Sequence, residues 1–149
     1  MNDPDQLFQI GEVAERVGLS LRTVRYWEEM RLVRPSARSA GGFRLYSNAD
    51  LERFLLAKRM RPLGLTLEEM GELADLIEHS AHPSGLPNGE LRGLVETLRS
   101  YAKRADEAIE KLERELSSAR QLRLRIGERL GRSEGTLEHD ETSPDLTPT

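Results

Sequence analysis

The chain contains no cysteine in its 149 residues. Disulfide bonds, thiolate zinc sites, cysteine-ligated iron–sulfur clusters and thiol redox sensing are therefore excluded within it. No apolar run approaches the roughly 20 residues that a membrane-spanning helix needs. The first residues, Met-Asn-Asp-Pro-Asp-Gln, are acidic and lack the basic and apolar regions of a signal peptide. We therefore expect a cytoplasmic protein without a membrane partner.

Patterns typical of catalysis or metal binding are also missing. The sequence has no recognisable Ser/His/Asp arrangement, glycine-rich phosphate loop or paired-carboxylate pocket, so we do not expect an enzyme. His79 and His82 are spaced i, i+3, but they lie in a segment rich in proline and glycine and have no third ligand nearby. A pair of linker histidines is more often simply polar than metal-binding. We expect no metal and no cofactor.

The charge of the chain is unevenly distributed, although its net value is only −4. Residues 1–65 hold 11 Lys/Arg and 8 Asp/Glu, a net charge of +3, whereas residues 66–149 hold 11 and 18, a net charge of −7. Within residues 20–62 the count is 10 basic to 4 acidic. Because salt screens charges beyond about 10 Å, a local basic patch can attract a phosphate backbone even on an acidic chain.

Residues 20–30 predict a helix with two different faces. One face is apolar, with Leu21, Val24, Trp27 and Met30 at i, i+3 spacing. The other face carries Arg22, Arg25, Tyr26 and Glu29. Such a face suits the groove of a polyanion, and the alternative is an ordinary solvated surface. We expect Trp27 in the core and Glu28 in an ion pair with a nearby arginine.

The neighbouring segments favour a polyanion-binding role for this helix face over an ordinary solvated surface. Ile10, Val13 and Val17 mark a preceding helix that ends at Gly18, and two short helices joined by a glycine-containing turn are typical of a helix-turn-helix. Ser20 is a suitable N-cap for the second helix. Residues 38–46 predict a two-stranded hairpin that turns at Gly41-Gly42, where positive φ is readily adopted. The far strand of this hairpin carries Phe43, Arg44 and Tyr46.

Two capping-box patterns predict two further helices. The first, Ser47-Asn-Ala-Asp50, opens a helix that is broken by Pro62 and Gly64. Its inner side is expected to hold Leu51, Phe54, Leu55 and Lys58. The second, Thr66-Leu-Glu-Glu69, opens a helix whose inward residues are expected to be Leu67, Met70, Leu73, Ala74 and Ile77. Residues 8–78 together are expected to form one DNA-binding domain.

Residues 90–130 predict a single long helix. Its apolar residues recur at alternating spacings of three and four, with one stutter, and about 40 residues make a rod of roughly 60 Å. The alternative to a dimer is a helix that folds back on its own domain, but so long a stripe favours a partner helix. The residues expected at the dimer interface are Leu91, Leu94, Leu98, Tyr101, Ala105, Leu112, Leu116, Ala119 and Ile126. Three segments are expected to be irregular: a disordered arm at 1–7, a linker at 79–89 and a disordered tail at 131–149.

The order of these motifs resembles the MerR family of bacterial transcription regulators. The resemblance covers roughly residues 8–78. It is carried by Ile10-Gly-Glu-Val-Ala, Gly18-Leu-Ser, Arg22-Thr-Val-Arg-Tyr-Trp-Glu28, Gly42-Phe-Arg-Leu-Tyr46-Ser and Leu63-Gly-Leu-Thr-Leu-Glu-Glu69. Members of that family are dimers joined by an antiparallel coiled coil. They bind a promoter palindrome and realign its −35 and −10 elements for RNA polymerase by distorting the DNA.

The resemblance also implies roles for individual residues. Arg22, Thr23, Arg25 and Tyr26 match the recognition helix; Arg38, Phe43, Arg44 and Tyr46 match the wing; and Arg61 matches the basic region after it. Trp27 stands where the family commonly has tyrosine. Metal- and redox-sensing members carry cysteines at the end of the dimerisation helix, so those effector classes are not expected here. The polar residues after the long helix are also too few for a separate effector domain.

The predicted fold is mostly α, a winged helix-turn-helix domain with a small β-hairpin followed by a long dimerisation helix. The predicted function is sequence-specific regulation of transcription. The expected partners are double-stranded promoter DNA, a second copy of the chain, and RNA polymerase indirectly. Two alternatives stay open at this point: a coiled-coil adaptor for another protein, and a DNA-architectural or recombination accessory protein of the same winged type.

Overall fold

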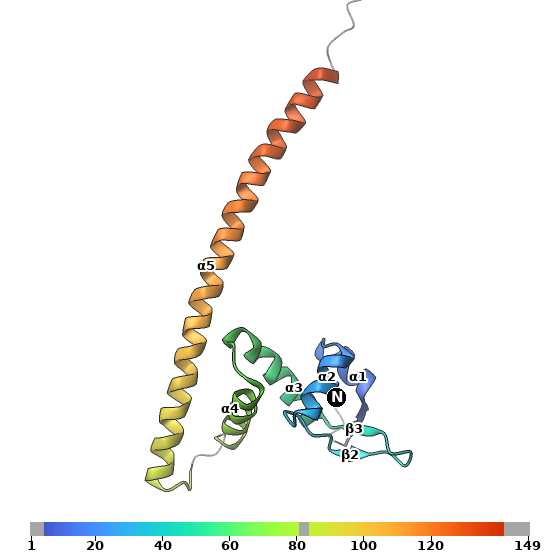
Figure 1. The fold of residues 1–149 in the computed structure, drawn as a ribbon, viewed down its shortest axis with the longest axis vertical. Coiled ribbons are helices and arrows are strands. Elements are labelled where there is room, and N and C mark those ends of the chain that lie inside the picture. Colours follow the sequence, from blue (N-terminus) through green and yellow to red (C-terminus); the bar gives the residue numbers. More distant parts are fainter. Residues whose placement is uncertain (1–4, 81–83, 142–149) are drawn as a thin grey trace, which may run out of the picture. The chain divides into compact units, whose positions relative to one another are not determined.

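The computed structural model describes residues 5–80 and 84–141 (Figure 1). The chain divides into two units, Met1–Ala105 and Asp106–Thr149, and the last helix contributes to both. In chain order the elements are β1 (Phe8–Gln9), α1 (Ile10–Val17), α2 (Leu21–Glu29), β2 (Ala37–Arg38), β3 (Arg44–Tyr46), α3 (Asn48–Met60), the 3-10 helix η1 (Arg61–Leu63), α4 (Leu67–His79) and α5 (Asn88–Glu141).

Parts of the segments expected to be irregular lie outside the described residues. These are residues 1–4 of the arm, residues 81–83 of the linker, which include His82, and residues 142–149 of the tail. Among the helices that the structure does describe, none combines the length and the apolar character needed to cross a membrane.

The sheet has three antiparallel strands in the order β1-β3-β2, one more than the predicted hairpin. Figure 1 shows β2 and β3 as a hairpin, the wing. Its turn requires positive φ only at Gly42 (80°), not at both glycines of the predicted pair. The additional strand β1 pairs Phe8 with Tyr46 and closes the inner edge of the wing. β1 has only two residues, so it is too short for a periodic pattern of apolar residues to predict it from the sequence.

The helix-turn-helix forms as predicted. Gly18 adopts the left-handed conformation (φ 64°) at the end of α1, and Leu19 N–H donates to the Ala14 carbonyl at 3.0 Å. Ser20 then caps α2, where its hydroxyl accepts from the Thr23 amide at 3.1 Å. A side chain at Gly18 would also meet the ammonium of Lys58, because a Cβ there would lie 2.9 Å from Nζ. The positive φ favours glycine at this turn, whereas the end of the flexible Lys58 side chain can shift to admit a Cβ.

α2 ends in a Schellman-type turn that lacks the usual glycine. Leu32 N–H donates to the Trp27 carbonyl and Arg31 N–H donates to the Glu28 carbonyl, both at 2.9 Å. This hydrogen-bond pattern places Arg31 in the left-handed region, with φ 59°. A residue with a Cβ is less stable there than glycine. The turn returns Leu32 and Val33 to the core, where both are buried.

The two predicted capping boxes are both present, so α3 and α4 begin at Asn48 and Leu67. Arg53 joins these helices to the turn after α2. Its Nε donates to the Leu32 carbonyl at 2.6 Å, and its terminal nitrogens lie 2.8 Å from Asp75 and from Glu78. One partly buried cation therefore connects three segments of the domain.

The core of the first unit is centred on Phe54 of α3. Trp27 stacks against it at 6.2 Å between ring centroids, and Tyr46 meets it edge-on at 5.8 Å. The expected core position of Trp27 is confirmed, since its side chain is buried. The predicted inner faces are partly wrong: Leu21, Met30 and Ile77 are exposed, while Ala57 and Met60 are buried without having been predicted. The apolar stripe of a helix continues past the part that another helix covers. The three residues wrongly predicted as buried, Leu21, Met30 and Ile77, lie at or near the ends of their helices.

The long helix extends further than predicted at its C-terminus, because α5 continues to Glu141. Disorder at residues 131–141 is therefore wrong. The prolines and most of the threonines behind that prediction are concentrated in residues 142–149. Gly131 and Gly135 each cost about 1 kcal/mol relative to alanine in a helix, which a proline-free segment tolerates.

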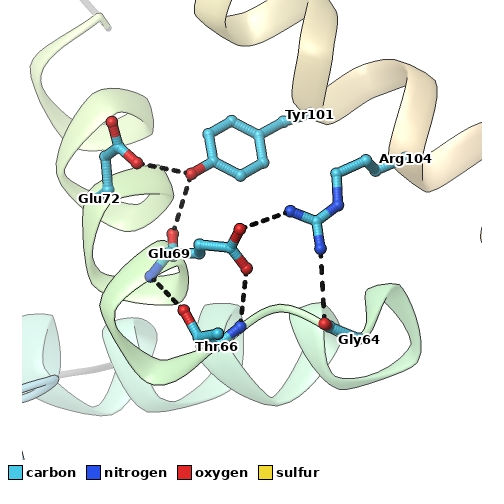
Figure 2. Close-up of polar contacts among 6 residues, drawn as sticks. All are labelled: Gly64, Thr66, Glu69, Glu72, Tyr101 and Arg104. Atoms are coloured by element: carbon cyan, nitrogen blue, oxygen red, sulfur yellow. Dashed lines mark hydrogen bonds and ion pairs between the residues drawn. The ribbon is translucent and has the colours of Figure 1, made fainter.

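The first part of α5 packs on α4 within the first unit through a set of polar contacts that we call the α4–α5 clamp (Figure 2). The Tyr101 hydroxyl donates to a Glu72 carboxylate oxygen at 2.7 Å, and Arg104 lies 2.8 Å from Glu69. The second carboxylate oxygen of Glu69 accepts from the Thr66 amide at 2.8 Å as part of the capping box of α4. Glu69 therefore fixes both the start of α4 and its attachment to α5.

Candidate nucleic-acid interface

The outer face of α2 is open to solvent and rich in cations. Arg22 and Arg25 are exposed and Tyr26 is half exposed. The Thr23 hydroxyl shares a hydrogen bond of 2.8 Å with Ser20 at the helix start. With Glu29, these side chains line one shallow concavity. The predicted recognition-helix residues therefore lie together on one accessible face.

A second hollow, of about 300 Å³, lies between α2 and the wing. It brings together four of the predicted DNA-binding residues, Arg25, Arg38, Phe43 and Arg44. Arg38 donates to the Gly42 carbonyl at 3.2 Å, which folds its side chain back along the wing turn. The Phe43 ring is 69% exposed beside these cations. An exposed aromatic ring among arginines is a surface suited to a nucleic-acid backbone.

An ion pair joins the wing to α2. Arg44 Nε lies 2.8 Å from a Glu28 carboxylate oxygen, which confirms the expected pairing of Glu28 with a nearby arginine. The Glu28 side chain is only 9% exposed, whereas that of Arg44 is 39% exposed. The guanidinium of Arg44 is therefore held by Glu28 while the side chain stays partly exposed.

The assignment of Tyr46 to the DNA-binding surface is wrong. Its side chain is 0% exposed, and its hydroxyl donates to Glu28 at 2.7 Å. Burial, reinforced by that hydrogen bond, raises the pKa of Tyr46 well above its ordinary value of 10.0. Its ring packs edge-on against Phe54 of α3, and Phe8 of β1 lies beside it in the sheet as its register partner. Tyr46 is therefore a core residue that connects the wing to Glu28 of α2.

Arg61 lies apart from the wing, at the start of η1. Its guanidinium carbon is 5.1 Å from the centroid of the Trp27 ring, a cation–π contact. The side chain is nevertheless exposed, so Arg61 stays a predicted contact with DNA. Its orientation is fixed by Trp27, and the tyrosine that the family commonly has there would offer a smaller ring.

Two residues at the wing hollow were missed by sequence reasoning. Gln9 and Ile10 line it from the start of α1. They carry no charge and stand outside the helical pattern of α2, so nothing in the sequence distinguishes them. Only the pairing of β1 with β3 carries them beside the arginines.

The residues predicted at the dimer interface differ in their exposure within the chain, and Leu91, Leu94 and Ala105 are partly exposed. Tyr101 is 8% exposed and belongs to the core of the first unit, so its assignment to the dimer interface is corrected by contacts within the chain. Leu98 packs against that core but is only partly buried, so it stays a predicted interface residue. The described stretch Ile109–Glu141 is instead exposed throughout, including Leu112, which is 47% exposed. The same stripe is therefore covered by α4 near its start and is uncovered in the second unit.

Two short helices joined by a tight turn, with arginines on the outer face of the second helix and a hairpin beside it, define the winged helix-turn-helix class of DNA-binding proteins. Residues 8–77 match the model of the MerR HTH family regulatory proteins. The chain belongs to this family.

The chain is similar to several members of this family, and each match covers a different share of the two chains. It is 35% identical over 111 residues to the HTH-type transcriptional activator mta of Bacillus subtilis, a match that covers 74% of this chain and 41% of that protein. The solved N-terminal part of the B. subtilis multidrug transporter activator MtaN is 35% identical, with 73% of this chain and 97% of that chain covered and a TM-score of 0.44. HiNmlR, a MerR family regulator solved in complex with promoter DNA, shares the fold at a TM-score of 0.56 and 19% identity, with 75% and 80% covered. The chain spans about half the length of the curated relatives it matches.

Proposed function

We propose that the chain is a sequence-specific, DNA-binding regulator of transcription that binds a promoter palindrome as a homodimer. The observation that carries this proposal is the position of Arg25, which belongs both to the outer face of α2 and to the wing hollow. A helix inserted into a major groove through Arg22 and Arg25 would bring Arg38 and Arg44 to the flanking phosphates.

The second unit supports the homodimer. An exposed leucine stripe along Ile109–Glu141 is unstable in water unless another helix covers it. Charge favours an antiparallel partner: residues 106–115 hold five acidic and two basic side chains, whereas residues 119–132 hold five arginines and one glutamate. In an antiparallel pair these two segments face each other, while in a parallel pair like charges would meet.

Distortion of the promoter is the proposed mode of action. Two DNA-binding domains held at a fixed separation select DNA that can bend or untwist to meet both, and such deformation costs several kcal/mol in a sequence-dependent way. RNA polymerase would then respond to the realigned promoter without direct contact with this chain. A protein that works on chromosomal promoters acts in the cytoplasm.

The alternative of a coiled-coil adaptor is disfavoured. The family match covers residues 8–77, which include the arginines of α2 and the wing, and not α5. The relatives reported above are named as regulators or activators of transcription, and none is named as an enzyme.

The proposal is tested by selecting binding sites from random duplex DNA with the full chain and measuring affinity for the selected sequence by fluorescence anisotropy. A palindrome with nanomolar affinity and steep salt dependence is the expected result. Arg25→Ala should weaken binding by tenfold or more, since one good arginine contact is worth about 1–3 kcal/mol. Arg114→Ala, an exposed arginine of the second unit, is the matched control and should bind normally. Selection of no sequence, or equal losses for the two variants, would contradict the proposal.

A further inference from the structure

Leu21, the first residue of α2, lies at the surface instead of in the core where the sequence predicted it. Its side chain is 44% exposed, whereas Val24 and Trp27 of the same predicted stripe are buried. Within residues 5–80 and 84–141, Leu21 belongs neither to the buried core nor to the partly buried side chains that pack against it. The domain therefore closes its core without this leucine.

Leu21 lies in the concavity on the outer face of α2, which it lines together with Arg22, Arg25 and Tyr26. Leu21 and Arg25 are four residues apart, a spacing that places two side chains of a helix next to each other. Single exposed leucines are common on protein surfaces. This one, however, lies within the basic surface that the proposed function places against DNA, where binding would remove its side chain from water.

The cap of α2 determines which side chains of the first turn are available to a ligand. The Ser20 hydroxyl accepts from the Thr23 amide at 3.1 Å and shares a hydrogen bond of 2.8 Å with the Thr23 hydroxyl. Of the first three helical residues, Leu21 and Arg22 are the exposed ones. Residues at the start of a recognition helix contact base edges when the helix enters a major groove. Leu21 therefore has a position suited to reading a base, but its side chain can form no hydrogen bond.

An apolar side chain in this position is complementary to one group of the major groove. Among the four standard bases, only thymine presents an apolar group there, its C5-methyl. A leucine placed against a phosphate would instead remove water from a charge without pairing it. We propose that Leu21 is a specificity-determining residue that contacts the methyl group of one thymine in each half of the operator. This inference rests on the proposed function and adds an apolar contact to the arginine contacts of the same helix.

Deoxyuridine tests the contact, because it pairs with adenine as thymidine does and lacks only the methyl group. The operator selected by the full chain is prepared with deoxyuridine in place of thymidine at one position at a time, in both halves, and its affinity is measured by fluorescence anisotropy. One symmetric pair of positions should weaken wild-type binding about fourfold for each half, the value of one buried methyl-sized group. Equal affinity after every replacement overturns the proposal.

Variants connect the methyl group to Leu21. Leu21→Ala should bind the thymine operator more weakly than the wild type and should no longer distinguish thymine from uracil at that pair of positions. Met30→Ala is the matched control, because Met30 is an exposed apolar residue at the other end of α2 and is not among the described residues that line the concavity. It should keep the full preference for thymine. A uracil effect of equal size in Leu21→Ala would come from the shape of the DNA and overturns the assignment.

A second selection from random duplex DNA, carried out with Leu21→Ala, should return the same operator with the thymine preference lost at that pair of positions alone. Loss of preference at every position would make Leu21 a structural residue of α2 and overturns the proposal. If the wild type selects no operator, the proposed function is wrong and this inference falls with it. If the wild type selects an operator that Arg25→Ala binds weakly, but no position responds to uracil, only the role of Leu21 is wrong.

Discussion

Arg44 and Tyr46, both on β3, hold different oxygens of the same carboxylate, that of Glu28 on α2. The wing and α2 are therefore joined through one side chain that is almost out of contact with water. Glu28 neutralises part of Arg44 and satisfies the hydroxyl of Tyr46. The position of the wing next to α2 depends on this carboxylate.

Glu28→Ala should lower the free energy of unfolding by about 1–3 kcal/mol, because the buried Tyr46 hydroxyl loses its acceptor. Urea denaturation followed by circular dichroism measures the change. Tyr46→Phe introduced into the Glu28→Ala background should recover part of the loss, since no hydroxyl is then left unpaired. If the two changes add without recovery, the hydrogen bond does not contribute as described.

The clamp predicts a specific dependence of stability on acid. The hydrogen bond from Arg104, followed by that from the Thr66 amide, lowers the pKa of Glu69 below 4.5 in the folded state. The unfolded chain therefore binds more protons between the folded pKa and 4.5, so stability is complete above about pH 4.5 and is lost as pH falls through the folded pKa.

Arg104→Met should flatten this acid limb of the stability curve. Thermal unfolding between pH 3 and 6 measures the slope, with Arg99→Met, an exposed arginine of the same helix, as the control. An equal slope in wild type and Arg104→Met would show that the ion pair does not act on Glu69.

Leu112→Asp should separate the proposed dimer into monomers and abolish operator binding, because it puts a charge into the exposed apolar stripe of the second unit. Gln121→Asp introduces the same charge on the opposite side of the helix and should leave the dimer intact. Analytical ultracentrifugation measures both. An intact Leu112→Asp dimer would place the interface elsewhere.

Arg31→Gly should stabilise the first unit by about 0.5–1 kcal/mol, because glycine adopts φ 59° without the Cβ penalty. Arg34→Gly removes an equal charge three residues later, where φ is not positive, and should not stabilise. Urea denaturation at high salt, which screens the loss of charge, compares the two. Equal effects would contradict the strain at Arg31.

The parts of the fold that sequence reasoning predicted are those set by local chemistry. Ser20, Ser47 and Thr66 begin their helices because a hydroxyl within reach of an amide three residues on needs no distant partner. The resemblance to the MerR family, which rested on such local motifs in order, is confirmed by the family match to residues 8–77. The roles of the individual arginines in DNA binding stay predictions.

The predictions that were wrong concern residues whose burial depends on a segment far away in the sequence. Tyr46 follows Arg44 at the two-residue spacing of one strand face, yet its ring packs against Phe54 of α3, and Phe8, almost 40 residues earlier, lies beside it in the sheet. Tyr101 follows the same apolar spacing as Leu112, yet only Tyr101 meets α4. A periodic stripe shows that a helix face will be covered, but the identity of the covering segment depends on contacts far along the chain.

The double use of Glu69 makes two features of the first unit inseparable. One of its carboxylate oxygens accepts from the Thr66 amide at the start of α4, and the other forms the ion pair with Arg104 of α5. A substitution of Glu69 therefore removes the helix cap and the ion pair together, and the two contributions are separated only by changing Thr66 or Arg104.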